Sequence, residues 1–194
     1  AFPCWMIARS LETLSLRMQK HIDNTRKVVA FLDSHEAIES VSYPELPSHP
    51  DHGLAKRILP RGCGAVFSFS LKGGRAAGKR FIESLKVFSH LANVGDAKSL
   101  VIHPATTTHY RMDEAALRAA GITEGTVRLS IGLEDAYDLI EDLGRAWPLE
   151  GQQPGALGAV LNVYPAGELP AKPVLKPRQH RRAVLARRHF ALEH

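Results

Sequence analysis

The feature that most constrains this chain is a helical apolar stripe that starts near the N-terminus. Side chains of the stripe recur every three or four residues, at Ile7, Leu11, Leu14, Met18, Ile22, Thr25, Val29 and Leu32. This spacing keeps them on one side of an α-helix. It predicts a single long helix over about residues 4–33, with Pro3 in the first turn, where its missing N–H costs nothing. A helix of this length is expected to be a spine that links domains or lies across one.

Shorter strands and helices follow the spine in mixed order, which predicts an α/β fold. The expected elements are a strand that starts at residue 38, an alternating strand at 64–71, a helix at 75–88, a helix capped by Asp113, and a strand at 125–131 that leads into a helix with Glu134 and Asp135 in its first turn. The gaps between these elements have the length of hairpins. We therefore expect an antiparallel sheet with helices packed on one face.

One residue of the last strand does not fit its neighbours. In GTVRLSIGLED, residues 125–135, Val127, Leu129 and Ile131 alternate as a buried face, so Arg128 lies on the other face. An arginine in the middle of a strand has two interpretations. It is either a solvated charge, or a guanidinium that the strand holds rigidly to meet an anion. The residues alone leave both open.

The net charge of +5 lies in the last quarter of the chain. Residues 1–144 carry 17 basic and 17 acidic side chains, whereas residues 145–194 carry eight basic and three acidic ones. A neutral body argues against a nucleic-acid partner, and no apolar run is long enough to predict a membrane span. The last fifty residues hold six of the twelve prolines and no apolar periodicity. They are expected to form a disordered or irregular, Pro-rich basic tail.

Cysteine and histidine patterns predict no metal site. Cys4 and Cys63 are far apart and form no Cys-x-x-Cys pair, so free thiols in a reducing cytoplasm are expected. His49 and His52 have a spacing that metal ligands use, but no cysteine or acidic cluster stands near them. They are better explained as polar residues at the start of a helix.

Four stretches, taken in order, resemble the C-terminal part of the Cys/Met-metabolism family of pyridoxal-phosphate enzymes. They are LETLSLRMQKH, YPELPSHPDHGLAKRILPRGCGAVFSFSLKGG, HLANVGDAKSLVIHPATTTHYRM and GITEGTVRLSIGLEDAYDLIEDL. The resemblance covers about residues 1–144 without interruption. VRLSIGLED is typical of the family generally, whereas ANVGDAKSLVIHPATTTH favours the O-acetylhomoserine sulfhydrylase branch over the cystathionine lyases and synthases.

The resemblance implies a fold, an activity and a setting. Residues 1–144 are expected to be the small domain of a fold-type-I enzyme, including the spine helix, and residues 145–194 to be unrelated to the family. The whole protein is expected to be a cytoplasmic homotetramer that uses pyridoxal phosphate to convert O-acetylhomoserine and sulfide, or a thiol, into homocysteine, or methionine, and acetate. The alternatives are a cystathionine γ-synthase, a methionine γ-lyase, or a non-catalytic oligomerisation or binding module.

The resemblance also implies site residues. Arg128 is expected to bind the α-carboxylate of an amino-acid substrate, because a planar fork of donors suits a carboxylate. Asn93 stands where relatives usually have a serine near that carboxylate, and a contact through its backbone is compatible with this change. Both are substrate-binding candidates.

No residue of the chain is expected to bind the cofactor or to act as the Schiff-base lysine. Every lysine lacks the Ser/Thr-x-Thr-Lys-like context that the family uses. Asp23-Asn24-Thr25 matches the family's motif at the pyridine nitrogen only superficially, and it is expected on the polar side of the spine helix. The resemblance therefore implies a C-terminal fragment that is inactive by itself.

Overall fold

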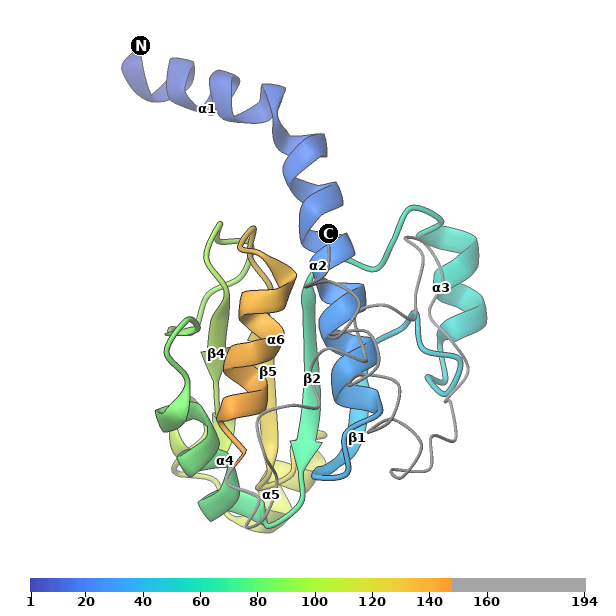
Figure 1. Ribbon diagram of the computed structural model, residues 1–194, viewed down its shortest axis with the longest axis vertical. Helices are drawn as coiled ribbons and strands as arrows, with labels where there is room; N and C mark the ends of the chain where they lie inside the picture. The colour runs from blue at the N-terminus through green and yellow to red at the C-terminus, as the bar shows by residue number, and fades with distance from the viewer. Residues whose placement is uncertain (148–194) are drawn as a thin grey trace, which may run out of the picture.

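The computed structural model describes residues 1–147, and a five-stranded sheet forms its centre (Figure 1). The strand order is β1-β2-β5-β4-β3. The strands are β1 (Ile38–Ser42), β2 (Val66–Leu71), β3 (Ser89–His90), β4 (Leu100–Ile102) and β5 (Thr126–Ser130). The structure confirms the predicted α/β class.

The sheet is mixed rather than wholly antiparallel. β1, β2, β5 and β4 pair antiparallel, as predicted, whereas β3 lies parallel to β4. Residues 91–99 carry the chain back past the end of the sheet before β4 begins, so β3 and β4 run in the same direction. A parallel pair needs such a crossover instead of a hairpin.

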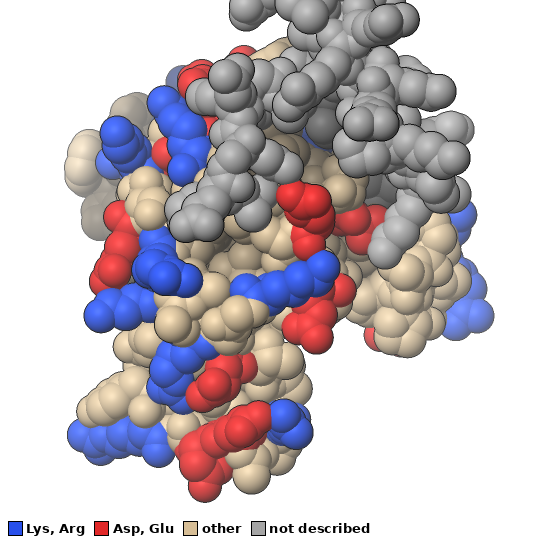
Figure 2. Space-filling view, turned by 60° about the horizontal axis from the view of Figure 1, so that its bottom comes forward, with Lys and Arg blue, Asp and Glu red and all other residues tan. Residues whose placement is uncertain are grey.

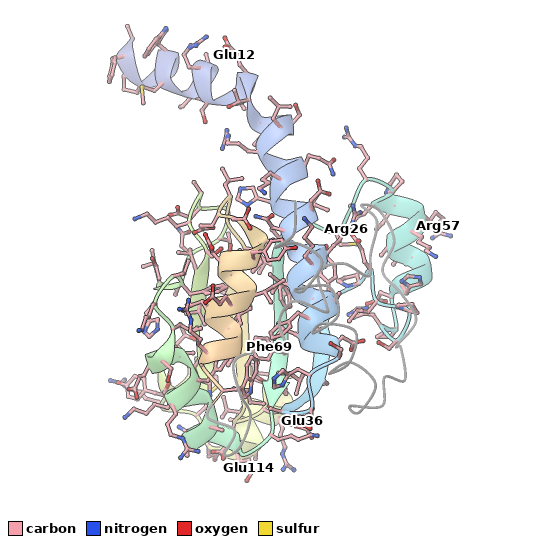
Figure 3. The ribbon with its side chains drawn as sticks, viewed as in Figure 1. Glu12, Arg26, Glu36, Arg57, Phe69 and Glu114 are labelled. Carbon is pink, nitrogen blue, oxygen red and sulfur yellow. The ribbon has the colours of Figure 1, made fainter. Side chains whose placement is uncertain are left out.

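Helices α2 (Leu14–Asp33), α4 (Gly74–Ser84) and α6 (Ala136–Arg145) cover one face of the sheet. Their buried side chains share one core with the inward side chains of the strands: Val28, Val29, Leu32, Phe67, Phe69, Phe81, Ile82, Val127, Leu129, Leu139, Ile140 and Leu143. Phe69 lies in the middle of this layer (Figure 3) and meets Phe81 edge to face at 5.8 Å between ring centroids. The prediction of helices on one face is therefore confirmed.

The spine consists of two helices rather than one. α1 (Phe2–Glu12) ends before Thr13, whose φ of −105° and ψ of 6° separate it from α2. Arg17 Nη2 donates to the carbonyl oxygen of Ser10 at 2.6 Å and to its Oγ at 3.0 Å. The guanidinium thus satisfies a carbonyl at the end of α1. Figure 1 shows α1 leaving the body at an angle to α2, which corrects the single helix expected over residues 4–33.

The apolar stripe is buried over its second half. Ile22 and the residues that follow it lie in the core, whereas Ile7 and Leu11 are 62% and 60% exposed. α1 has no buried residue at all. The periodicity therefore predicts the helical conformation, but not which part of the stripe packs on this domain.

Side-chain caps define the starts of the last two helices. Asp113 caps α5 (Glu114–Ala119) by accepting the Ala116 N–H at 2.8 Å, as predicted. Asp135 caps α6 by accepting the Tyr137 N–H at 2.7 Å. Glu134 therefore lies before the helix and not in its first turn, because the cap residue itself stands outside the helical hydrogen-bond ladder.

The core continues past residue 144. Ala146 is buried, and the Trp147 ring stacks on His35 at 4.2 Å and lies 4.6 Å from the ring of Phe81. Apart from residues 145–147, the predicted Pro-rich tail lies outside the described residues.

The surface mixes charges of both signs. On the face drawn in Figure 2, acidic and basic side chains are interspersed, so this face presents no large field of one sign. Within residues 1–147, no helix is long and apolar enough to cross a membrane.

Candidate functional site

Arg128 lies in the middle of β5, an interior strand, on the face of the sheet opposite to the helices. Its partners in register are Ser68 on β2 and Ile102 on β4. Val127 and Leu129, its neighbours along the strand, are completely buried in the core, and alternation sends the Arg128 side chain to the other face. A paired strand thus holds the base of the side chain rigidly.

Arg128 has no acidic partner in the part of the chain that the structure describes. None of the ion pairs formed within residues 1–147 includes it. Its guanidinium is partly exposed and donates one long hydrogen bond, from Nη2 to the carbonyl oxygen of Asn93 at 3.4 Å. A guanidinium has five N–H donors, so most of them remain available to an anion.

Asn93 meets Arg128 through its main chain. It lies in the loop between β3 and β4, where its side-chain Oδ1 accepts the N–H of Val94 at 2.9 Å. In the same loop, the Gly95 N–H donates to Ser130 Oγ at 3.3 Å. The loop therefore lies against the polar face of β5 beside the guanidinium, and the Asn93 side chain is turned to its own backbone.

The second helix of the spine, α2, holds the backbone that follows β5. His21 Nδ1 donates to the carbonyl oxygen of Ile131 at 2.7 Å. Asn24 Nδ2 donates to the carbonyl oxygens of Gly132 and Glu134 at 3.0 and 2.8 Å. Asn24 is completely buried, which corrects the expectation that Asp23-Asn24-Thr25 lies on the polar side of the spine.

The same turn is joined to the loop that carries Asn93. The Glu134 carboxylate accepts the N–H of Ser99 at 2.7 Å and its hydroxyl at 2.9 Å. Ser99 Oγ in turn accepts the Gly132 N–H at 2.8 Å. A Cβ on Gly132 would lie 2.3 Å from Glu134 Oε2 and 2.5 Å from the Ala97 carbonyl oxygen. In the sequence, the position of Gly132 directly after the strand is the feature that could have indicated this close contact.

A cavity of about 530 Å³ lies beside α3 (His52–Ile58) and α2, away from Arg128. Arg26 extends from α2 into this region (Figure 3) and bonds Glu45 through Nε at 2.7 Å. Glu45 also accepts the Cys63 N–H at 2.9 Å. Burial, together with the nearby Glu45 charge, raises the pKa of the Cys63 thiol. Arg26, Glu45 and Cys63 thus satisfy one another at this cavity, whose lining also includes the exposed Lys56.

The two histidines with a metal-like spacing also have local roles. His49 Nδ1 accepts the Asp51 N–H at 3.1 Å, and His52 Nδ1 donates to the Pro44 carbonyl oxygen at 3.1 Å. Among residues 1–147, no group of three His, Cys, Asp or Glu side chains is placed to hold a metal ion.

The described lysines do not fit pyridoxal phosphate as Schiff-base partners. They are all exposed: Lys20, Lys27, Lys56, Lys72, Lys79, Lys86 and Lys98. Lys79 forms an ion pair with Glu83, and Lys72 donates to the Glu36 carbonyl oxygen. A nucleophilic lysine needs a desolvated pocket or a neighbouring cation to lose its proton. An exposed side chain has no desolvated pocket.

Comparisons with known proteins show which family this chain resembles. Residues 1–148 match the family model described as Cys/Met metabolism PLP-dependent enzyme. The chain is 45% identical over 143 residues to an O-acetyl-L-homoserine sulfhydrylase of Corynebacterium glutamicum, covering 74% of this chain and 33% of the relative. It is 46% identical over 147 residues to an L-methionine gamma-lyase of Treponema denticola, covering 75% and 36%.

A solved structure shows the same similarity. The crystal structure of an O-acetylhomoserine (thiol)-lyase from Campylobacter jejuni, which contains N'-pyridoxyl-lysine-5'-monophosphate, matches with a TM-score of 0.68 and 44% identity. The match covers 73% of this chain and 34% of that one. The chain thus spans about a third of the length of the relatives it matches.

Proposed function

Because this chain belongs to the family of Cys/Met metabolism PLP-dependent enzymes, we propose that it supplies the α-carboxylate site for the amino-acid substrate of such an enzyme. The reaction we favour is that of the sulfhydrylase branch: O-acetylhomoserine and sulfide, or a thiol, give homocysteine, or methionine, and acetate. The similarity to a methionine gamma-lyase supports a C–S lyase as the second candidate. Both reactions use an amino acid, so both need a group that recognises its carboxylate.

The unpaired guanidinium of Arg128 is the observation that carries this proposal. A guanidinium presents parallel N–H donors that match the two oxygens of a carboxylate. The strand fixes its base, and the Asn93 carbonyl oxygen engages one donor, at 3.4 Å. The remaining donors are free to bind the substrate, and no carboxylate among residues 1–147 competes for them.

The described residues form the recognition part of the proposed site and not its chemical part. They offer no lysine that fits the cofactor, so we propose that groups outside residues 1–147 hold pyridoxal phosphate. The inactivity of this chain by itself stays a prediction. The homotetramer and the cytoplasmic location implied by the resemblance also stay predictions.

A titration of the 194-residue chain with O-acetyl-L-homoserine tests the carboxylate site. We expect saturable binding that shifts the Arg128 Nε–Hε signal in the NMR spectrum of the ¹⁵N-arginine-labelled protein. Arg128→Gln should abolish it. Arg128→Lys should weaken it at least tenfold, because an ammonium lacks the parallel donors and each charge-assisted hydrogen bond is worth about 1.5–3 kcal/mol.

Arg75 supplies the matched control. Its guanidinium is already engaged by Glu124 at 3.1 Å and by the Ala105 carbonyl oxygen at 2.7 Å. Arg75→Gln should therefore leave the affinity unchanged, and the methyl ester of the ligand, which lacks the carboxylate, should not bind. Binding that survives Arg128→Gln, or the absence of any saturable binding, would contradict the proposed site and favour the non-catalytic module.

A further inference from the structure

Arg128 and Asn93 belong to two segments whose direct contact is weak. The β3–β4 loop and β5 meet at this point through two hydrogen bonds of 3.3 and 3.4 Å, both longer than the usual N–H···O distance. Such contacts are too weak to fix the loop beside the guanidinium. The groups that do so lie further along both segments.

Shorter hydrogen bonds join residues 97–99 to residues 132–134. Ser99 donates through its N–H and its hydroxyl to the Glu134 carboxylate, at 2.7 and 2.9 Å. Ser99 Oγ accepts the Gly132 N–H at 2.8 Å, and the Leu133 N–H donates to the Ala97 carbonyl oxygen at 2.8 Å. The bonds to Glu134 are charge-assisted and so stronger than neutral ones. They set how closely the loop approaches the end of β5.

The spine helix holds the other side of this turn. Asn24 Nδ2 donates to two carbonyl oxygens, of Gly132 and Glu134, and these two acceptors define the orientation of its amide. Asn24 Oδ1 is left buried without a partner among the described residues. An unpaired buried acceptor is unfavourable. The two hydrogen bonds that Nδ2 donates are therefore what favours asparagine at this position.

We propose that Asn24 and Glu134 are positioning residues for the Arg128 site. Asn24, with His21, holds the 131–134 turn on α2, and Glu134 transmits that position to Ser99 and the loop that carries Asn93. The inference rests on the proposed role of Arg128 as a carboxylate ligand. It makes the orientation of the spine helix a determinant of carboxylate affinity, because a shift of α2 moves the turn and, with it, the loop.

Asp142 offers a matched control. Like Glu134, it is a carboxylate that accepts backbone N–H groups from a distant segment, of Lys86 at 3.0 Å and Val87 at 2.8 Å. Asp142 is buried, whereas Glu134 is half-buried, and Asp142 lies on α6, on the face of the sheet opposite to Arg128. Removing its charge tests whether any loss of a buried carboxylate weakens ligand binding.

The experiment measures the Kd of O-acetyl-L-homoserine for variants of the 194-residue chain, at a temperature where circular dichroism shows each variant folded. Glu134→Ala should weaken binding about tenfold, because a small displacement of a binding group has large effects. It should also shift the NMR signals of the Arg128 side chain and the Gly95 amide. Glu134→Gln, which keeps an acceptor for the Ser99 N–H, should restore part of the affinity. Asp142→Asn should lower Tm and leave Kd within about twofold.

Ser99→Ala removes the hydroxyl with little change of volume. It tests the same hydrogen-bonded connection between the loop and the 131–134 turn if Glu134→Ala does not fold. Wild-type binding by folded Glu134→Ala or Ser99→Ala would overturn the positioning role and leave the Arg128 proposal standing. Equal weakening by Asp142→Asn would also overturn it, because the effect would then be general destabilisation. A wild-type chain without Arg128-dependent binding would overturn both proposals.

Discussion

Replacing Gly78 by alanine should destabilise the domain by forcing a buried histidine to move. An added Cβ would lie 2.3 Å from Nε2 and 2.6 Å from Cδ2 of His103. The imidazole is completely buried, so it can move only by displacing packed neighbours. Its Nε2 donates to the Glu124 carbonyl oxygen at 2.8 Å, and its Nδ1 accepts from Thr106 Oγ1 at 2.8 Å.

The magnitude follows from three opposing effects. Alanine in place of glycine inside a helix gains about 0.5–1 kcal/mol. Overpacking a filled core costs about 1–3 kcal/mol, and loss of the His103–Glu124 hydrogen bond costs about 0.5–1.5 kcal/mol. The clash therefore wins, with a net loss of about 1–3 kcal/mol in the free energy of unfolding. For a chain of this size, that corresponds to a Tm lower by about 2–12 °C.

Gly53 provides the comparison, because it is helical, exposed and free of any heavy atom within 4 Å of an added Cβ. Gly53→Ala should be neutral or stabilising by up to about 1 kcal/mol. Urea unfolding followed by circular dichroism measures both variants against the wild type. The reasoning is refuted if Gly78→Ala unfolds at the same urea concentration as Gly53→Ala.

Two further predictions concern the aromatic and histidine side chains of the core. Burial lowers the pKa of His103 and of His35, so the unfolded chain takes up protons first as the pH falls. Their contribution to stability is complete above the ordinary histidine pKa of about 6.5 and is lost below it. Tm should thus be lower at pH 5.5 than at pH 7.5, and His35→Phe should reduce the difference; a Tm independent of pH would contradict this. Trp147→Ala should lower the free energy of unfolding by about 1.5–3 kcal/mol, since the ring packs on Phe31, His35 and Phe81, and an unchanged urea midpoint would show that the ring contributes nothing.

The local elements of the fold were predictable because their signals are local. Alternation in residues 125–131 places Val127 and Leu129 in the core and Arg128 on the other face, and the structure agrees. The break at Thr13 was not predictable, because the apolar spacing runs through it unchanged. The parallel pairing of β3 with β4 was not predictable either, because a strand of two residues is too short to show any alternation.

Most contacts around the candidate site could not be predicted from the sequence. Asn24 and its acceptors are 108 and 110 residues apart, and Glu134 and Ser99 are 35 apart. No periodicity links positions at such separations. A polar residue is also assigned to the surface unless its buried partner is known, which explains why Asn24 was expected on the polar side of the spine.

The break at Thr13 divides the spine into two helices that differ in their local stability against unfolding. α1 buries no side chain, and a helix of 11 residues is marginal in water without tertiary contacts. Its amide protons should therefore exchange with solvent deuterium through local fraying. The amides of α2 around Val28 and Leu32 lie in the core and exchange only when the whole domain opens. An exchange map should thus show protection rising along residues 14–33 from the Thr13 side, so that the spine is anchored at one end and conformationally adaptable at the other.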